Sequence, residues 1–81
     1  MNSLVLKYIL TIAEEKNMTR AAERLYISQP SLSQSVKNLE KELGVDLFER
    51  SQRGGVLTPA GEHYVEWAKQ ILFAEAMMKR K

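Results

Sequence analysis

The polar side chains between Ser28 and Gly44 offer most of the chemistry that this 81-residue sequence can perform. If the stretch is helical, its amide, hydroxyl and ammonium groups gather on one face at about 100° per residue. That face comprises Pro30, Gln34, Lys37, Asn38 and Lys41, with Ser33 beside it. The acidic residues Glu40 and Glu42 fall on its flanks. A face that carries hydrogen-bonding groups and positive charge, but no carboxylate, suits a polyanion with exposed hydrogen-bonding groups, such as the base edges in the DNA major groove. The alternative is an ordinary polar surface helix.

Local signals set the ends of this helix. The Ser28 hydroxyl can cap the first turn, and Pro30 lacks an N–H group that would be unsatisfied there anyway. Gly44 can adopt the left-handed conformation that ends a helix. The arc opposite the polar face is predicted to be buried, and it comprises Leu32, Val36, Leu39 and Leu43.

Length, charge and cysteine content narrow the class of protein. Eighty-one residues make one small domain with a thin core, which a partner surface would help to stabilise. A net charge of +2 and an isoelectric point near 9.0 permit nucleic acid as a partner without requiring it. The sequence has no cysteine and a single histidine, so it offers no obvious metal site. It shows neither a membrane span nor a secretory signal, and we expect a cytoplasmic protein.

Catalytic groups are not arranged for an enzyme. His63, Asp46 and the serines are too scattered to pair a nucleophile with a base, and no glycine-rich phosphate loop is present. We therefore expect neither catalysis nor a bound cofactor in this chain. The serines are interpreted as caps and polar contacts.

Two predicted helices precede the central one. Over 2–16, one apolar arc provides the core candidates Leu4, Val5, Tyr8, Ile9 and Ile12. A second strip, comprising Leu6, Leu10 and Ala13, is either scattered exposed residues or contact with a second subunit, and we favour the subunit.

The next helix is predicted over 20–26, with Asn17 ending the helix before it and Thr19 as its cap. Arg20 and Arg24 fall on its exposed side, for phosphate contact or simply for solubility. A short helix, a tight turn and a polar-faced helix form a helix-turn-helix, although such hairpins also occur in proteins that bind no nucleic acid.

The segment after Gly44 is expected to form a hairpin from residues 46–50 and 56–58, which we call the wing (residues 46–58). Its tip carries Ser51, Gln52 and Arg53, with Arg50 nearby. Arginine on a wing suits the DNA backbone or the narrow minor groove. The alternative is a hairpin that only covers the edge of the core.

A long helix is predicted from Pro59 to Lys79, because Thr58 and Pro59 are a cap residue and a first-turn proline. Its apolar arc covers about half the circumference, more than one small core requires. We expect part of it to pack on its own domain and part on another subunit. The chain ends without a helix stop, so we expect a longer parent protein. The predicted division is therefore a DNA-binding domain over 1–58 and a linker helix over 59–81.

Four sequence blocks carry a family resemblance: AAERL, SQPSLSQ, LEKELGVDLFER and LTPAGE, in that order. In these blocks the chain closely resembles the N-terminal domain of LysR-type bacterial transcriptional regulators. The resemblance implies a mainly α fold, a winged helix-turn-helix of three helices plus a two-stranded wing, followed by a long linker helix. It also implies a homodimer, paired through antiparallel linker helices, on double-stranded DNA. Full-length members add a C-terminal domain for a small effector.

The resemblance also implies roles for individual residues. The base-facing positions are Gln29, Pro30, Ser33, Gln34 and Lys37. Contacts near the backbone map to Thr19, Arg20, Ser28, Ser31 and Arg50, the wing arginine is Arg53, and Thr58 lies close to a phosphate. The dimerisation candidates are Leu6, Leu10, Val65, Ala68, Leu72 and Ala76. The family often has arginine where this chain has Gln34 and Lys37, so we transfer no base identities. A winged-helix module for dimerisation or protein contacts, without DNA recognition, remains the alternative function.

Overall fold

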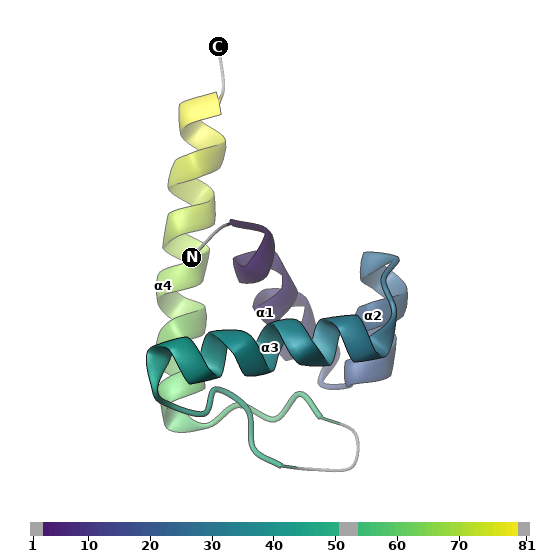
Figure 1. Cartoon of the computed structure of the whole chain (residues 1–81). Coiled ribbons are helices and arrows are strands. Elements are labelled where there is room, and N and C mark those ends of the chain that lie inside the picture. The colour runs from purple at the N-terminus through teal and green to yellow at the C-terminus, as the bar shows by residue number, and fades with distance from the viewer. Residues whose placement is uncertain (1–2, 51–53, 80–81) are drawn as a thin grey trace.

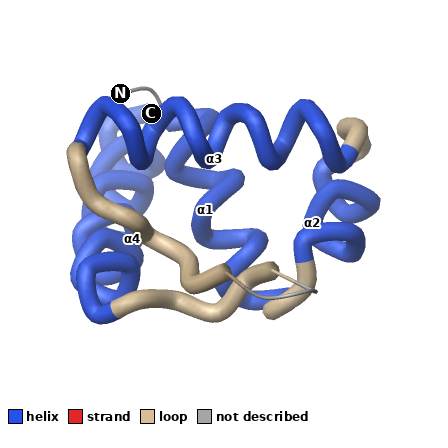
Figure 2. The backbone as a smooth tube through the Cα atoms, turned by 60° about the horizontal axis from the view of Figure 1, so that its bottom comes forward, coloured by secondary structure: helices blue, strands red, loops and turns tan. Residues whose placement is uncertain are grey.

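The computed structural model describes residues 3–50 and 54–79, which contain four α-helices. These are α1 (Ser3–Glu15), α2 (Met18–Leu25), α3 (Gln29–Leu43) and α4 (Pro59–Lys79). Helix α1 packs against all three others, and Figure 2 shows it enclosed between α2, α3 and α4. The wing leaves α3 and returns to α4 below this helical layer (Figure 1). The fold is therefore the predicted mainly α arrangement.

The central position of α1 corrects two expectations for that helix. Leu6 is only 3% exposed and belongs to the core with Ile9 and Ile12. Leu10 also packs against this core, whereas Leu4, which we expected inside, is 54% exposed. A helix covered on several sides needs more than one apolar strip, so the second strip serves the domain's own core.

Helix α2 begins two residues earlier than predicted. The side chain of Asn17 accepts a 2.9 Å hydrogen bond from the backbone N–H of Arg20, so Asn17 and not Thr19 is the N-cap. The preceding helix ends at Glu15, and Lys16 takes the left-handed conformation with φ of 54°. Tyr26 also adopts a left-handed conformation, and its backbone N–H closes α2 by donating to earlier carbonyls.

Helix α3 has the predicted caps. Ser28 accepts from the backbone N–H of Ser31, and Gly44, with φ of 76°, donates its N–H to the carbonyl of Glu40. The predicted buried arc is confirmed at Leu32, Val36 and Leu39. Leu43 was also expected there but is 38% exposed, because the chain turns away from the core at Gly44.

The wing is paired at its base. Phe48 and Leu57 form one antiparallel β-bridge, flanked by hydrogen bonds from Glu49 N–H to the Val56 carbonyl and from Thr58 N–H to the Leu47 carbonyl. The register agrees with the predicted hairpin, although the described residues hold only this bridge and no longer strands. The predicted tip, Ser51 to Arg53, lies outside the described residues.

Helix α4 starts at Pro59 as predicted and serves two purposes. Its first turns pack into the core through Gly61, Tyr64, Val65 and Ala68. Val65 is 8% exposed and Ala68 is 1% exposed within one chain. The expectation that these two side chains contact a second subunit is therefore corrected, as it is for Leu6, because their own domain already covers them. The C-terminal half of α4 projects beyond the other helices (Figure 1).

Candidate nucleic-acid interface

The outer face of α3 presents the predicted polar groups. Five of its members are exposed and Ser33 is half-buried; the exposed ones are Pro30, Gln34, Lys37, Asn38 and Lys41. The side-chain amide of Gln34 donates a 2.9 Å hydrogen bond to the amide oxygen of Asn38. This bond orients Gln34 along the helix while its own amide oxygen stays available to a ligand.

One hydrogen bond ties together the first turns of α2 and α3, and another lies within the N-terminus of α3. The Thr19 hydroxyl donates to the side-chain oxygen of Gln29 over 3.3 Å, across the two helices. The Ser28 hydroxyl donates to the Ser31 hydroxyl over 2.9 Å. All four residues are exposed, as is Arg20. The N-terminus of α3 thus combines hydroxyl groups with the positive end of the helix dipole, which suits an anion such as phosphate.

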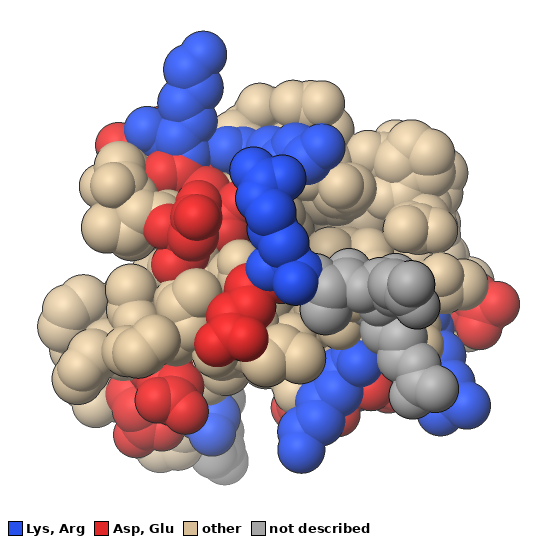
Figure 3. Space-filling view, turned by 90° about the horizontal axis from the view of Figure 1, so that it is seen from below, with Lys and Arg blue, Asp and Glu red and all other residues tan. Residues whose placement is uncertain are grey.

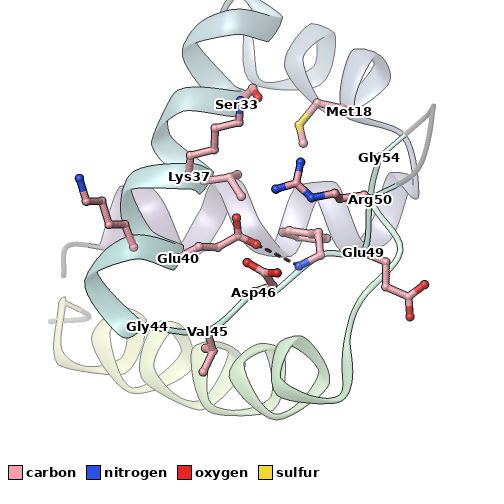
Figure 4. A pocket seen from close by; sticks show the side chains of 13 residues that line it. Met18, Ser33, Lys37, Glu40, Gly44, Val45, Asp46, Glu49, Arg50 and Gly54 are labelled. Carbon is pink, nitrogen blue, oxygen red and sulfur yellow. Dashed lines mark hydrogen bonds between the residues drawn. The ribbon is translucent and has the colours of Figure 1, made fainter.

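An open groove of about 720 Å³ lies between α3 and the wing. Ser33 and Lys37 line it from α3, Arg50 and Gly54 from the wing, and Met18 from α2. Figure 4 shows the Arg50 guanidinium turned toward the α3 side of this groove, facing Ser33 and Lys37. The fold therefore brings together two cations, one from the helix and one from the wing, that lie 13 residues apart in sequence.

Acidic groups also lie on this side of the molecule. Seen from below, acidic side chains are interspersed with basic ones (Figure 3). Asp46 and Glu49 are exposed in the wing, and Glu42 is exposed near the end of α3. Three carboxylates, those of Glu40, Asp46 and Glu49, also line the groove that Arg50 enters, and the Glu49 carboxylate points outward in Figure 4. The absence of carboxylates predicted for the polar face is therefore a property of the α3 face and not of the whole surface.

Glu40 has a role that sequence reasoning missed. Its carboxylate accepts two backbone hydrogen bonds from the wing, from Leu47 N–H at 2.7 Å and from Phe48 N–H at 3.1 Å. The sequence marks Glu40 only as a flanking acid on α3. No local signal could have identified these partners, because they depend on how the chain turns after Gly44.

Arg24 is engaged within the domain. Its guanidinium makes ion pairs with Glu14 at 2.6 Å and with Glu15 at 3.1 Å, both at the end of α1. The hydrogen bonds that its guanidinium donates to the Glu14 and Glu15 carboxylates raise the pKa of Arg24. Arg24 is therefore better interpreted as a link between α1 and α2. Of the two arginines of α2, Arg20 stays the candidate for a phosphate contact.

Thr58 is similarly occupied by intramolecular bonds. Its hydroxyl donates to the Asp46 carbonyl over 2.6 Å and accepts from Gly61 N–H over 3.0 Å. The threonine therefore caps α4, as its sequence position predicts, and also closes the base of the wing. A phosphate that approached the Thr58 hydroxyl would have to compete with these two intramolecular hydrogen bonds. Arg53 lies outside the described residues.

Apolar side chains remain uncovered along α4. An apolar groove of about 390 Å³ lies beside its first half, lined by Leu43, Val45, Trp67 and Ile71 among others. Further along, the exposed residues are Phe73, Met77 and Met78. Of the dimerisation candidates on this helix, Leu72 is half-buried and Ala76 is exposed. The domain itself therefore leaves part of the apolar surface of α4 exposed.

Neither a metal-ligand cluster nor a membrane-spanning helix occurs among the described residues, 3–50 and 54–79. They contain no group of three or more histidine, cysteine, aspartate or glutamate residues able to hold a metal ion. None of their helices is long and apolar enough to cross a membrane.

The arrangement of three helices, a wing and a polar helix face defines the class of winged helix-turn-helix proteins. The particular family follows from the sequence: residues 5–62 match the profile of bacterial regulatory helix-turn-helix proteins of the lysR family, and the chain belongs to that family. The resemblance inferred from the four sequence blocks is thereby confirmed.

Curated relatives are named as transcriptional regulators. The chain is 52% identical over 67 residues to the regulator BudR of Klebsiella aerogenes, covering 83% of this chain and 47% of that protein. It is 49% identical over 69 residues to CysL of Bacillus subtilis (strain 168), covering 85% and 23%. The chain thus spans less than half the length of these relatives.

Solved structures agree with the fold. The DNA-binding domain of CbnR in complex with DNA matches with a TM-score of 0.91 and 44% identity, covering 96% of this chain and 90% of that one. The DNA-binding domain of BenM on catB site 1 DNA matches with a TM-score of 0.89 and 38% identity, covering 96% and 87%. Full-length OxyR C199D from Pseudomonas aeruginosa matches with a TM-score of 0.90 and 47% identity, covering 98% and 27%.

Proposed function

We propose that this chain binds double-stranded DNA sequence-specifically as a homodimer and forms the DNA-binding part of a bacterial transcription regulator. The observation that carries the proposal is the groove that Lys37 of α3 and Arg50 of the wing line together, on a helix that also exposes the side chain of Gln34. In this proposal α3 enters the major groove and the wing follows the backbone into the neighbouring minor groove. The complexes of CbnR and BenM domains with DNA support it.

The proposed contacts divide into two groups. Base edges are read by Gln29, Pro30, Ser33, Gln34 and Lys37. The backbone and minor groove are contacted by Thr19, Arg20, Ser28, Ser31, Arg50, Arg53 and Thr58. The exposed residues of α3 and its N-terminal hydroxyl groups support this division, because amides can read base edges whereas helix N-termini and hydroxyls suit phosphate.

The proposed dimer uses α4. Leu72 and Ala76 are the remaining candidates there, and the exposed Phe73 and Met77 add apolar area on the projecting half of the helix. Leu10, partly covered by its own core, is a weaker candidate. A two-fold dimer would read an inverted repeat with half-sites spaced by whole helical turns.

The same proposal extends to the setting in which the chain acts. It assigns no cofactor and no catalytic residue to these 81 residues, and it leaves effector binding to the C-terminal domain of full-length members. The relatives are bacterial regulators, so we propose that the protein acts in the bacterial cytoplasm, where the chromosome is.

Selection from a random duplex library tests the proposal most directly. We expect the selected sites to share an inverted repeat, and we expect the logarithm of the binding constant to fall linearly with that of the salt concentration. A library that returns no shared sequence, with binding that is weak at every salt concentration, would contradict it.

A second function has two observations in its favour. The mixed charge around the wing and the apolar groove beside α4 would also suit a module that binds only proteins. That module would show no salt-dependent binding to duplex DNA of any sequence.

A further inference from the structure

We propose that Glu40 is a positioning residue: it holds the wing beside α3 so that Arg50 and Lys37 act on the same DNA duplex. The inference rests on the proposed function and deepens it, because it names the group that sets the spacing between the two DNA-contacting elements. Glu40 lies one helical turn after Lys37 on the flank of α3. Its half-buried carboxylate is turned toward the wing and not toward solvent (Figure 4).

The first arm of the wing is hydrogen-bonded on two sides. Toward the second arm, the Leu47 carbonyl accepts from Thr58 N–H and Glu49 N–H donates to the Val56 carbonyl. Toward α3, the N–H groups of Leu47 and Phe48 both donate to a single carboxylate oxygen of Glu40. An ionised acceptor makes stronger bonds than a neutral one, and both bonds are partly buried.

These bonds fix the arm two residues before Arg50. The side chains of Leu47 and Phe48 are buried in the core, while their backbone amides are held by Glu40. From this fixed point the chain carries the Arg50 guanidinium back into the groove beside Lys37. Releasing the two amides would let the arm move away from α3 and would separate the two cations.

The far side of the wing has its own, independent support. Gly55, with φ of 89°, lies so close to the turn after α1 that an added Cβ would be 2.6 Å from the Lys16 carbonyl carbon. A Cβ added at Gly54 would be 3.1 Å from the Cβ of Met18. Because this second arm is seated against the turn between α1 and α2 and against the start of α2, loss of the Glu40 bonds should free only the first arm and leave the helical core folded.

The test is a double-mutant cycle between Glu40 and Arg50 on a duplex selected by the wild-type 81-residue chain. In the wild-type background we expect Arg50→Ala to weaken binding about tenfold. In the Glu40→Ala background the same change should weaken it less than about threefold, because Arg50 is no longer held in place. Glu40→Gln keeps one acceptor oxygen and should restore part of the difference. Glu42→Ala removes the same charge from the same helix and should leave the tenfold effect intact.

Each outcome decides the inference. If Arg50→Ala costs the same in the Glu40→Ala and wild-type backgrounds, Glu40 is merely structural and the inference is wrong. Amide hydrogen exchange gives a readout without DNA: Leu47 and Phe48 should exchange faster in Glu40→Gln than in Glu42→Gln. Equal exchange in these two variants would overturn the inference even if Glu40→Ala failed to fold. If the wild-type chain selects no duplex, the proposed function fails, and the exchange result still tells whether Glu40 holds the wing.

Discussion

The Cα of Gly61, in the first turn of α4, packs directly against the carbonyl oxygen of Leu47 at the base of the wing. A Cβ at residue 61 would overlap that oxygen and would also come within 2.9 Å of the Leu57 side chain. Glycine is therefore required at this position for close approach rather than for an unusual backbone angle, since residue 61 is helical. The contact joins α4, the core and the wing at one point.

Gly61→Ala should destabilise the domain by about 3 kcal/mol, because a backbone carbonyl cannot move aside as a flexible side chain can. Such a loss would lower the melting temperature of a domain of this size by more than about 10 °C. Gly44→Ala is the control: nothing lies within 4 Å of its added Cβ, and only the left-handed backbone opposes it. Thermal unfolding that ranks the two variants in the opposite order would disprove the packing argument.

Asn17→Ala should cost about 1 kcal/mol of folding stability, since it removes the N-cap of α2. Thr19→Ala should change stability by less than about 0.5 kcal/mol, because Thr19 lies inside the helix and its bond to Gln29 is exposed. Urea unfolding of both variants checks the assignment of the cap. Equal losses would return Thr19 to the role that its sequence position first indicated.

Lys37→Ala and Gln34→Ala should affect DNA binding in different ways. Lys37 is cationic and is proposed to read a base edge, so removing it should reduce the salt slope of binding by about 1 and also flatten the preference at one base pair. Gln34→Ala should leave that slope unchanged and flatten the preference at one base pair. Library selection and salt titration of each variant separate the two roles. The same salt slope and sequence profile as wild type would remove that residue from the interface.

Ala76→Glu should weaken self-association at least about tenfold, because it places a charge on the exposed apolar half of α4. Gln70→Glu adds the same charge at another exposed position of the helix and is the matched control. Sedimentation over a range of concentrations measures both equilibria. Identical dimerisation of the two variants would show that the paired surface lies elsewhere on the chain.

Tyr64 should make stability depend on pH in alkali. Burial raises the pKa of the Tyr64 hydroxyl, and the nearby Glu42 carboxylate raises it further. Folding thus favours the neutral phenol. The contribution of Tyr64 to the free energy of unfolding is therefore complete below the ordinary tyrosine pKa of about 10, and it is lost as the pH rises from there through the higher pKa of the folded state. Urea unfolding at about pH 8 and about pH 11 should show a smaller pH effect for Tyr64→Phe than for wild type. Tyr26→Phe, at a residue 95% exposed, should retain the wild-type pH effect.

The ends and faces of α3 were predictable because the groups that determine them are neighbours in sequence. Ser28 caps the amide three residues ahead, Gly44 closes on a carbonyl four residues behind, and the arc of Leu32, Val36 and Leu39 repeats with the helix period. The start of α4 at Pro59 follows from the same kind of local chemistry. The family resemblance extended these local predictions to the winged fold.

Apart from the cap of α2, where Asn17 and not Thr19 accepts from the Arg20 amide, the main errors concern contacts between residues distant in sequence. Periodicity can show that Leu6 and Val65 are apolar on a helix face, but not which neighbour covers that face. The answer depends on α1 being enclosed by three helices. Arg24 likewise offered an exposed charge, and only the packing of α2 on α1 brought Glu14 and Glu15 to it.

The amino-acid sequence by itself determined the helices, the caps of α3 and α4 and the polar face of α3, since hydrogen bonds within a turn or two suffice to specify them. Only the tertiary structure decided that the Glu40 carboxylate binds the wing and that Arg50 faces Lys37. These partners meet because burial of apolar side chains in the core brings α3, α4 and the wing together. Hydrophobic burial is non-directional, so the local sequence does not show which distant segments it will bring into contact.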